Sequence, residues 1–203
     1  MSEGAIFLKR IMSQKSFAIA LLAATMVTAC VRQQKESSVV AAGPEQTPSP
    51  SNVFTLTSSA FKDGQPIPRQ HTCDGVNVSP GLEWTSVPKT ARTIAIIADD
   101  PDAPSGTFTH WVLYNLPAET MGMVENLPAT ENLKAGGQQG ENDFEKIGYG
   151  GPCPPSGRHR YFFRIYALDD ELELKAGAKR ADLEKAMEGH IVGQAQLMGT
   201  YKR

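Results

Sequence analysis

Short apolar runs separated by Gly, Pro, Asn and Asp dominate the chain from residue 53 onward. Within several runs apolar and polar residues alternate with a period of two, which is typical of β-strands. The runs rich in β-branched and aromatic residues predict strands at residues 54–58, 93–99, 108–116, 161–168 and 191–201. The run at 93–99 is apolar almost throughout, which indicates a strand covered on both faces of its sheet. The pattern predicts a mainly β domain, a sandwich or barrel of antiparallel strands.

One helix is predicted late in the chain, at residues 181–188. Leu183, Ala186 and Met187 recur there at helical spacing, and Gly189 stands where a left-handed residue often ends a helix. A domain of about 150 residues can bury a core of its own, so one domain at residues 53–203 is expected.

Residues 1–29 have the features of a secretion signal. A basic segment precedes an apolar run at residues 17–27. This run is too short for a membrane span, which takes about 20 helical residues. Met1 and Met12 are both usable starts, and the choice between them stays open.

The signal ends in Val-Thr-Ala-Cys at residues 27–30, which resembles the lipobox of bacterial lipoproteins. The resemblance implies cleavage before Cys30 and lipidation of its sulfur; an ordinary secretory signal cut nearby is the alternative. Val31, in place of the aspartate common in inner-membrane lipoproteins, favours the outer membrane, with the domain facing the periplasm. Residues 30–52 are rich in Gln, Ser, Pro and Ala and predict a disordered tether.

Two segments carry the residues suited to chemistry. The first, Asp-Asp-Pro-Asp-Ala-Pro at residues 99–104, must leave the sheet, because proline fixes the backbone and lacks a ladder donor. On the strand that follows it, a period of two would place four side chains on one face. They are Phe108, His110, Val112 and Tyr114.

The second segment is a loop of glycines and prolines at residues 148–157. Such a loop suits close passage of the backbone past a ligand. His159 and Tyr161 fall on one face of the strand that it enters. Arg160, on the other face, is expected to pair with a carboxylate such as Asp102, with a contact at the pocket rim as the alternative.

Together the two segments resemble the signature segments of phosphatidylethanolamine-binding proteins, the family that includes the Raf kinase inhibitor protein. The likeness extends from about residue 54 to the C-terminus and is of the shorter bacterial and archaeal subtype. It is carried by the order and spacing of short motifs, at residues 73–80, 82–84, 100–104, 142–144, 157–161 and 199–201. It implies an antiparallel Greek-key β-sandwich with one or two short helices.

The resemblance also implies a small pocket for a phosphate-like anion or a phospholipid head group. The positions that match the family's pocket are Asp100, Pro104, His110, Pro155, His159 and Tyr161, with Gly151 and Pro152 at the rim. Protonated imidazoles and a phenol are suitable anion donors. We expect Asp100 to orient and charge one histidine, because a nearby carboxylate favours the protonated form.

These features favour a binding module over an enzyme, with no cofactor. Hydrolysis by Asp100 with His110 or His159 is the alternative, and a protein-interaction module that inhibits kinases or proteases is another. A homodimer is compatible with the sequence. The formal net charge of −2, without a basic stripe, argues against nucleic acid as a partner.

Two cysteines remain within the predicted domain. Because the signal directs the domain to an oxidising compartment, a disulfide between Cys73 and Cys153 is expected, with free thiols as the alternative. A metal site is not expected, since the histidines and cysteines lack the spacing of a dedicated site.

Overall fold

The computed structural model describes residues 53–203. The predicted signal, Cys30 and the tether lie outside the described residues. The chain order of the elements is β1 (Thr55–Ser58), η1 (Arg69–His71), β2 (Leu82–Thr85), β3 (Thr93–Asp100), β4 (Phe108–Pro117), β5 (Gly122–Met123), β6 (Gln138–Gln139), β7 (Arg158–Leu168), α1 (Arg180–Met187) and β8 (Ile191–Lys202). Within the described residues, no helix is long and apolar enough to cross a membrane.

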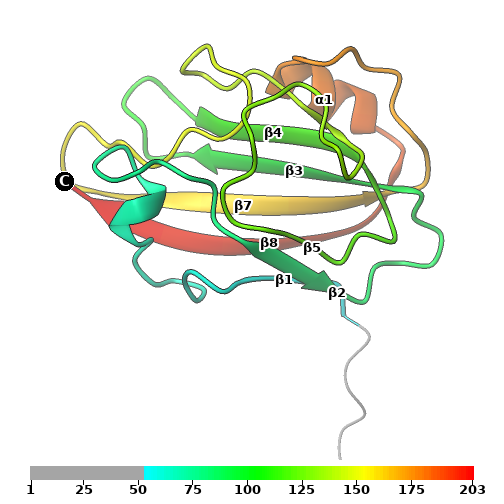
Figure 1. The fold of residues 1–203 in the computed structure, drawn as a ribbon, viewed down its shortest axis with the longest axis horizontal. Helices are drawn as coiled ribbons and strands as arrows, with labels where there is room; N and C mark the ends of the chain where they lie inside the picture. Colours follow the sequence, from blue (N-terminus) through cyan, green and yellow to red (C-terminus); the bar gives the residue numbers. More distant parts are fainter. Residues whose placement is uncertain (1–52) are drawn as a thin grey trace, which may run out of the picture. The chain divides into compact units, whose positions relative to one another are not determined.

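The strands form two antiparallel sheets. The larger has the order β6-β4-β3-β7-β8, and the smaller has the order β1-β2-β5. Figure 1 shows the long strands β4, β3, β7 and β8 side by side, with α1 next to β4. A long connection returns the chain from β4 to β7, which pairs with the other edge of β3. The candidate segments before β4 and β7 therefore meet at one end of the sheet.

Two clusters of buried side chains cover the two faces of the larger sheet. One lies between the sheets and includes Trp84, Trp111 and Phe163. The other lies on the opposite face, where Leu183 and Met187 of α1 pack against the sheet. Every residue of β3 is buried as a result, as its apolar sequence predicted.

The mainly β antiparallel architecture is confirmed, and each of the five predicted strands is present. β7 starts at Arg158, three residues earlier than predicted, so His159 lies inside the strand. The helix is shifted by one residue, and Gly189 after it has a φ of +83°, as a left-handed cap requires. The sequence pattern did not predict β2 (Leu82–Thr85), β5 (Gly122–Met123) or β6 (Gln138–Gln139). These strands have two to four residues each, which is too few to establish a period.

Candidate functional site

A cavity of about 210 Å³ lies where β3 ends and where β4 and β7 begin. Its walls come from the two segments singled out in the sequence and from one further loop. The lining residues are Asp100, Ala103, Pro104, Phe108, His110, Phe144, Cys153, Pro154, Pro155 and His159. Apolar walls thus surround two imidazoles and one carboxylate.

Asp100 and His159 form a buried pair at the cavity. The Nδ1 atom of His159 lies 2.7 Å from Oδ2 of Asp100, and both side chains are less than 10% exposed. Oδ1 of the same carboxylate accepts a hydrogen bond of 2.8 Å from the backbone N–H of Asp102. The carboxylate therefore fixes the imidazole orientation and leaves Nε2 of His159 available to a ligand.

His110 reaches the cavity because β4 contains a bulge. Ala98 pairs with Trp111 while Asp99 pairs with Thr109, so His110 is the extra residue between them. The expectation that His110 shares a face with Val112 and Tyr114 is wrong, because those two pack in the cluster under α1. A bulge inserts one residue and re-aims the side chains around it.

The His110 imidazole is held by the glycine-rich loop. Its Nδ1 donates to the carbonyl of Gly150 at 2.6 Å, and the N–H of Gly150 donates back to the carbonyl of His110 at 2.8 Å. Burial lowers the pKa of His110 below its ordinary value, which favours the neutral ring. With its proton on Nδ1, the neutral ring presents Nε2 as an acceptor.

Tyr161 was predicted to be a pocket residue, but it is not among the residues that line the cavity and packs behind His110. Its ring packs edge-on against His110 at 5.2 Å between centroids. Burial, and next the charge of Asp100, raise the pKa of the phenol far above its usual range. The hydroxyl has no hydrogen-bond partner within residues 53–203. A buried hydroxyl of this kind is costly, and its lack of a partner needs an explanation.

Phe144 closes one side of the cavity, and it was not among the predicted site residues. Its ring contacts Phe108 at 4.7 Å and His110 at 5.4 Å between centroids. The side chain of Asn142 holds this loop by accepting from the N–H of Phe144 and donating to the carbonyl of Gly148, both at 2.9 Å. The Asn-Asp-Phe motif had marked the loop as part of the family likeness without assigning it a role.

The other predicted pocket residues divide into two groups. Pro104 and Pro155 line the cavity. Gly151 and Pro152 do not, because both dock the loop onto the segment that contains Cys73. The N–H of Gly151 donates to Oδ1 of Asn77 at 2.8 Å, and the carbonyl of Pro152 accepts from the N–H of Cys73 at 3.1 Å. Gly151 and Pro152 were expected to shape the rim of the pocket. In the structure they join the glycine-rich loop to the segment that contains Cys73.

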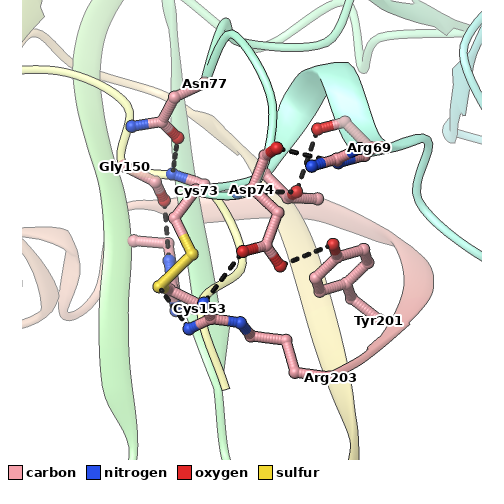
Figure 2. Close-up of a disulfide and its surroundings, with 11 residues drawn as sticks. Arg69, Cys73, Asp74, Asn77, Gly150, Cys153, Tyr201 and Arg203 are labelled. Carbon is pink, nitrogen blue, oxygen red and sulfur yellow. Dashed lines mark hydrogen bonds and ion pairs between the residues drawn. A yellow bond between two sulfur atoms is a disulfide. The ribbon is translucent and has the colours of Figure 1, made fainter. Parts of the chain in front are cut away.

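The predicted disulfide between Cys73 and Cys153 is present and reinforces the same junction. Figure 2 shows it beside Asp74, whose carboxylate accepts from Tyr201 at 2.8 Å and pairs with Arg203 at 2.9 Å. The guanidinium of Arg203 also lies 3.6 Å from Sγ of Cys153. The disulfide and this ion pair connect the cavity wall to the end of β8.

The three carboxylates at the end of β3 have separate partners. Asp99 points to the opposite face, where it pairs with Arg164 and Arg180. Asp102 forms a two-point ion pair with Arg160, as expected from the sequence, and hydrogen bonds from Arg160 lower the pKa of Asp102 to about 2. Asp100 is therefore the carboxylate of this group that faces the cavity.

The residues that the structure describes contain no group of three or more His, Cys, Asp or Glu side chains able to hold a metal ion. At the cavity, the acceptors of Asp100 are already used by His159 and by a backbone N–H. The groups that remain are the Nε2 atoms of His110 and His159 and the apolar walls. These groups suit an anion that has its own hydroxyl or an apolar part better than they suit a cation.

The lowered pKa of His110 predicts a loss of stability in acid. An unfolded histidine binds its proton near pH 6.5, whereas the folded domain disfavours the charged ring. The stability from the neutral ring is thus complete above that pH and is lost as the pH falls below it, by at most about 1.4 kcal/mol per pH unit. Urea denaturation from about pH 8 to about pH 5 should show a steeper loss for the natural chain than for His110→Gln. Equal slopes would contradict the prediction.

Comparison with known proteins agrees with this fold. Residues 57–202 match the family model described as phosphatidylethanolamine-binding protein. A UPF0098 protein of Methanothermobacter thermautotrophicus is 53% identical over 150 residues, covering 74% of this chain and 99% of that protein. A UPF0098 protein of Aquifex aeolicus is 47% identical over 154 residues, covering 74% and 90%.

Two solved structures share the fold. A phosphatidylethanolamine-binding-protein homologue from Chlamydia trachomatis superposes with a TM-score of 0.70 at 40% identity, covering 75% of this chain and 99% of that one. Escherichia coli YbcL, a member of the mammalian PEBP family by its description, gives 0.68 at 30% identity, covering 74% and 98%. With the family model matched across nearly the whole described part, the chain belongs to the phosphatidylethanolamine-binding-protein family.

Proposed function

We propose that the cavity binds a small phosphate-type anion, as a phosphate ester or a phospholipid head group, and that the protein acts by binding and not by turnover. The observation that carries the proposal is the convergence of three polar side chains from two remote segments on one cavity. These are Asp100 and His159, which form a pair, and His110, whose Nδ1 is held by Gly150.

The two histidines and the apolar walls have distinct parts in the proposed complex. Protonated His159, held by Asp100, donates from Nε2 to an anionic oxygen, which is a charge-assisted hydrogen bond. Neutral His110 accepts from a hydroxyl on the phosphorus, so a monoprotonated phosphate group satisfies both rings. The walls of Phe108, Phe144 and the prolines take the carbon part of an ester. The cavity volume of about 210 Å³ limits the bound part to a small group.

The proposal places the protein in the cell envelope, anchored through a lipid on Cys30 and facing the periplasm from the outer membrane. The sequence of residues 27–30 supports this, and the disulfide between Cys73 and Cys153 is compatible with an oxidising compartment. An anchored domain with an open head-group site would meet its ligand at or near the membrane surface.

Hydrolysis is the second candidate, and the Asp100–His159 pair favours it because a carboxylate-oriented imidazole is a suitable general base. Cys153 is the cysteine of the lining, and its sulfur is in the disulfide and is not available as a nucleophile. A water molecule would have to serve, activated by Nε2 of His159. Release of nitrophenol from nitrophenyl phosphate, lost in His159→Ala, would favour hydrolysis over simple binding.

The binding proposal predicts stabilisation by phosphoethanolamine and glycerol phosphate in a thermal-shift experiment. At a concentration 100 times Kd the domain gains about 2.7 kcal/mol, which raises Tm by several degrees. His159→Ala should weaken binding about 10- to 100-fold in titration calorimetry, because it removes a hydrogen bond to a charged group.

His190→Ala is the matched control. His190 pairs with Asp169 through Nδ1 at 2.9 Å, as His159 does with Asp100, but the pair is exposed and away from the cavity. This variant should bind phosphoethanolamine like the natural chain. Absence of any shift with the phosphate esters, or an equal loss in both variants, would overturn the proposal.

A further inference from the structure

A second cavity lies at the opposite end of β4, beyond Leu116, and takes no part in the proposed anion site. Its volume is about 290 Å³. The lining residues are Leu116, Thr120, Gly122, Met123, Val124, Leu127, Pro128, Leu133, Lys134 and Ala135. Leu116 follows Phe108, which lines the proposed anion site, by eight positions along β4, and at about 3.3 Å per residue the two cavities are well separated.

The lining is mostly apolar, and its polar side chains are those of Thr120 and Lys134. Lys134 is the charged residue among those that line the cavity, and it makes no ion pair within residues 53–203. No carboxylate belongs to the lining. Met121 and Val124 leave 53% and 73% of their surface exposed beside it. Exposed apolar surface gathered around a hollow is typical of a binding site.

The walls of this cavity are fixed by the fold. Met123, Leu127 and Leu133 pack against the core between the sheets. The buried side chain of Gln139 holds the loop by donating to the carbonyls of Pro128 and Thr130, both at 2.8 Å. The cavity therefore exists before a ligand arrives, which reduces the entropy cost of binding.

We infer that this cavity binds the alkyl chain of a single-chain carboxylic acid, with its carboxylate paired to Lys134. The apolar lining takes the chain, and the unpaired exposed ammonium supplies a complementary charge for the head. The volume lies at the small end of the range for ligand pockets, about 300–1,000 Å³, so one alkyl chain of medium length fits and two do not.

Titration calorimetry of the full chain with hexanoate, octanoate and decanoate, below their micelle concentrations, tests this inference. Affinity should increase about fourfold for each added methylene, because each removes apolar surface from water. Lys134→Met should weaken octanoate binding up to about fivefold and leave octanol binding unchanged. Affinity independent of chain length, or an equal effect of Lys134→Met on acid and alcohol, would overturn it.

Blocking variants locate the binding. Ala135→Trp places an indole in the lining and should abolish octanoate binding, whereas Ala129→Trp, an exposed position in the same loop outside the lining, should not. His159→Ala should bind octanoate normally, and phosphoethanolamine should not displace it. Displacement, or retained binding in Ala135→Trp, would refute this cavity as the site. Either proposal can thus fail while the other stands.

Discussion

Reduction of the Cys73–Cys153 disulfide should lower the free energy of unfolding by about 4–5 kcal/mol. The two cysteines are 80 residues apart, and a cross-link over so long a loop restricts the unfolded chain strongly. Because domains of this size have total stabilities of about 5–15 kcal/mol, the reduced chain would be marginal. Urea denaturation with and without dithiothreitol measures the difference through the midpoint.

The double variant Cys73→Ala with Cys153→Ala is the control, since reductant should not change its midpoint. Reduction should also weaken phosphoethanolamine binding, because Cys153 lines the anion cavity and its neighbours Pro154 and Pro155 form the same wall. A reduced chain that unfolds at the same urea concentration as the oxidised one would show that the junction of the two loops does not depend on the covalent link.

The strands and the helix could be predicted from the sequence because their patterns are long. The apolar run of β3 identified a strand buried on both faces, and the spacing of Leu183, Ala186 and Met187 identified α1. The short strands β2, β5 and β6 depend on pairing with distant segments, and local pattern contains little of that information.

The candidate site was predicted mainly through the family likeness, which assigned Asp100, His110 and His159 to one pocket. Periodicity alone placed His159 with Tyr161 but put His110 on the wrong face. The bulge in β4 contains no glycine or proline to indicate it, because it results from the register between β3 and β4. Phe144 comes from a distant loop, so no local pattern could assign it to the site.

The sequence indicated partners for Asp100 and Asp102 but not for Asp99. Alternation along the strand sends Asp99 to the face that α1 covers and Asp100 to the cavity. Asp99 is 1% exposed, and its Oδ2 atom takes both arginine contacts while Oδ1 has no partner in the described part of the chain. The cavity at the end of β3 therefore lies one residue from a buried charge that is paired with two arginines.

Replacing both Arg164 and Arg180 with Met should lower the free energy of unfolding by about 3–5 kcal/mol, because a buried carboxylate is left without a partner. Adding Asp99→Leu should recover most of the stability, because apolar replacement of a whole buried ion pair is often neutral. Urea denaturation of the double and triple variants measures both effects. If the triple variant is as unstable as the double one, the arginines stabilise the sheet through packing on Phe162, whose ring lies 4.9 Å from the Arg164 guanidinium, and not through Asp99.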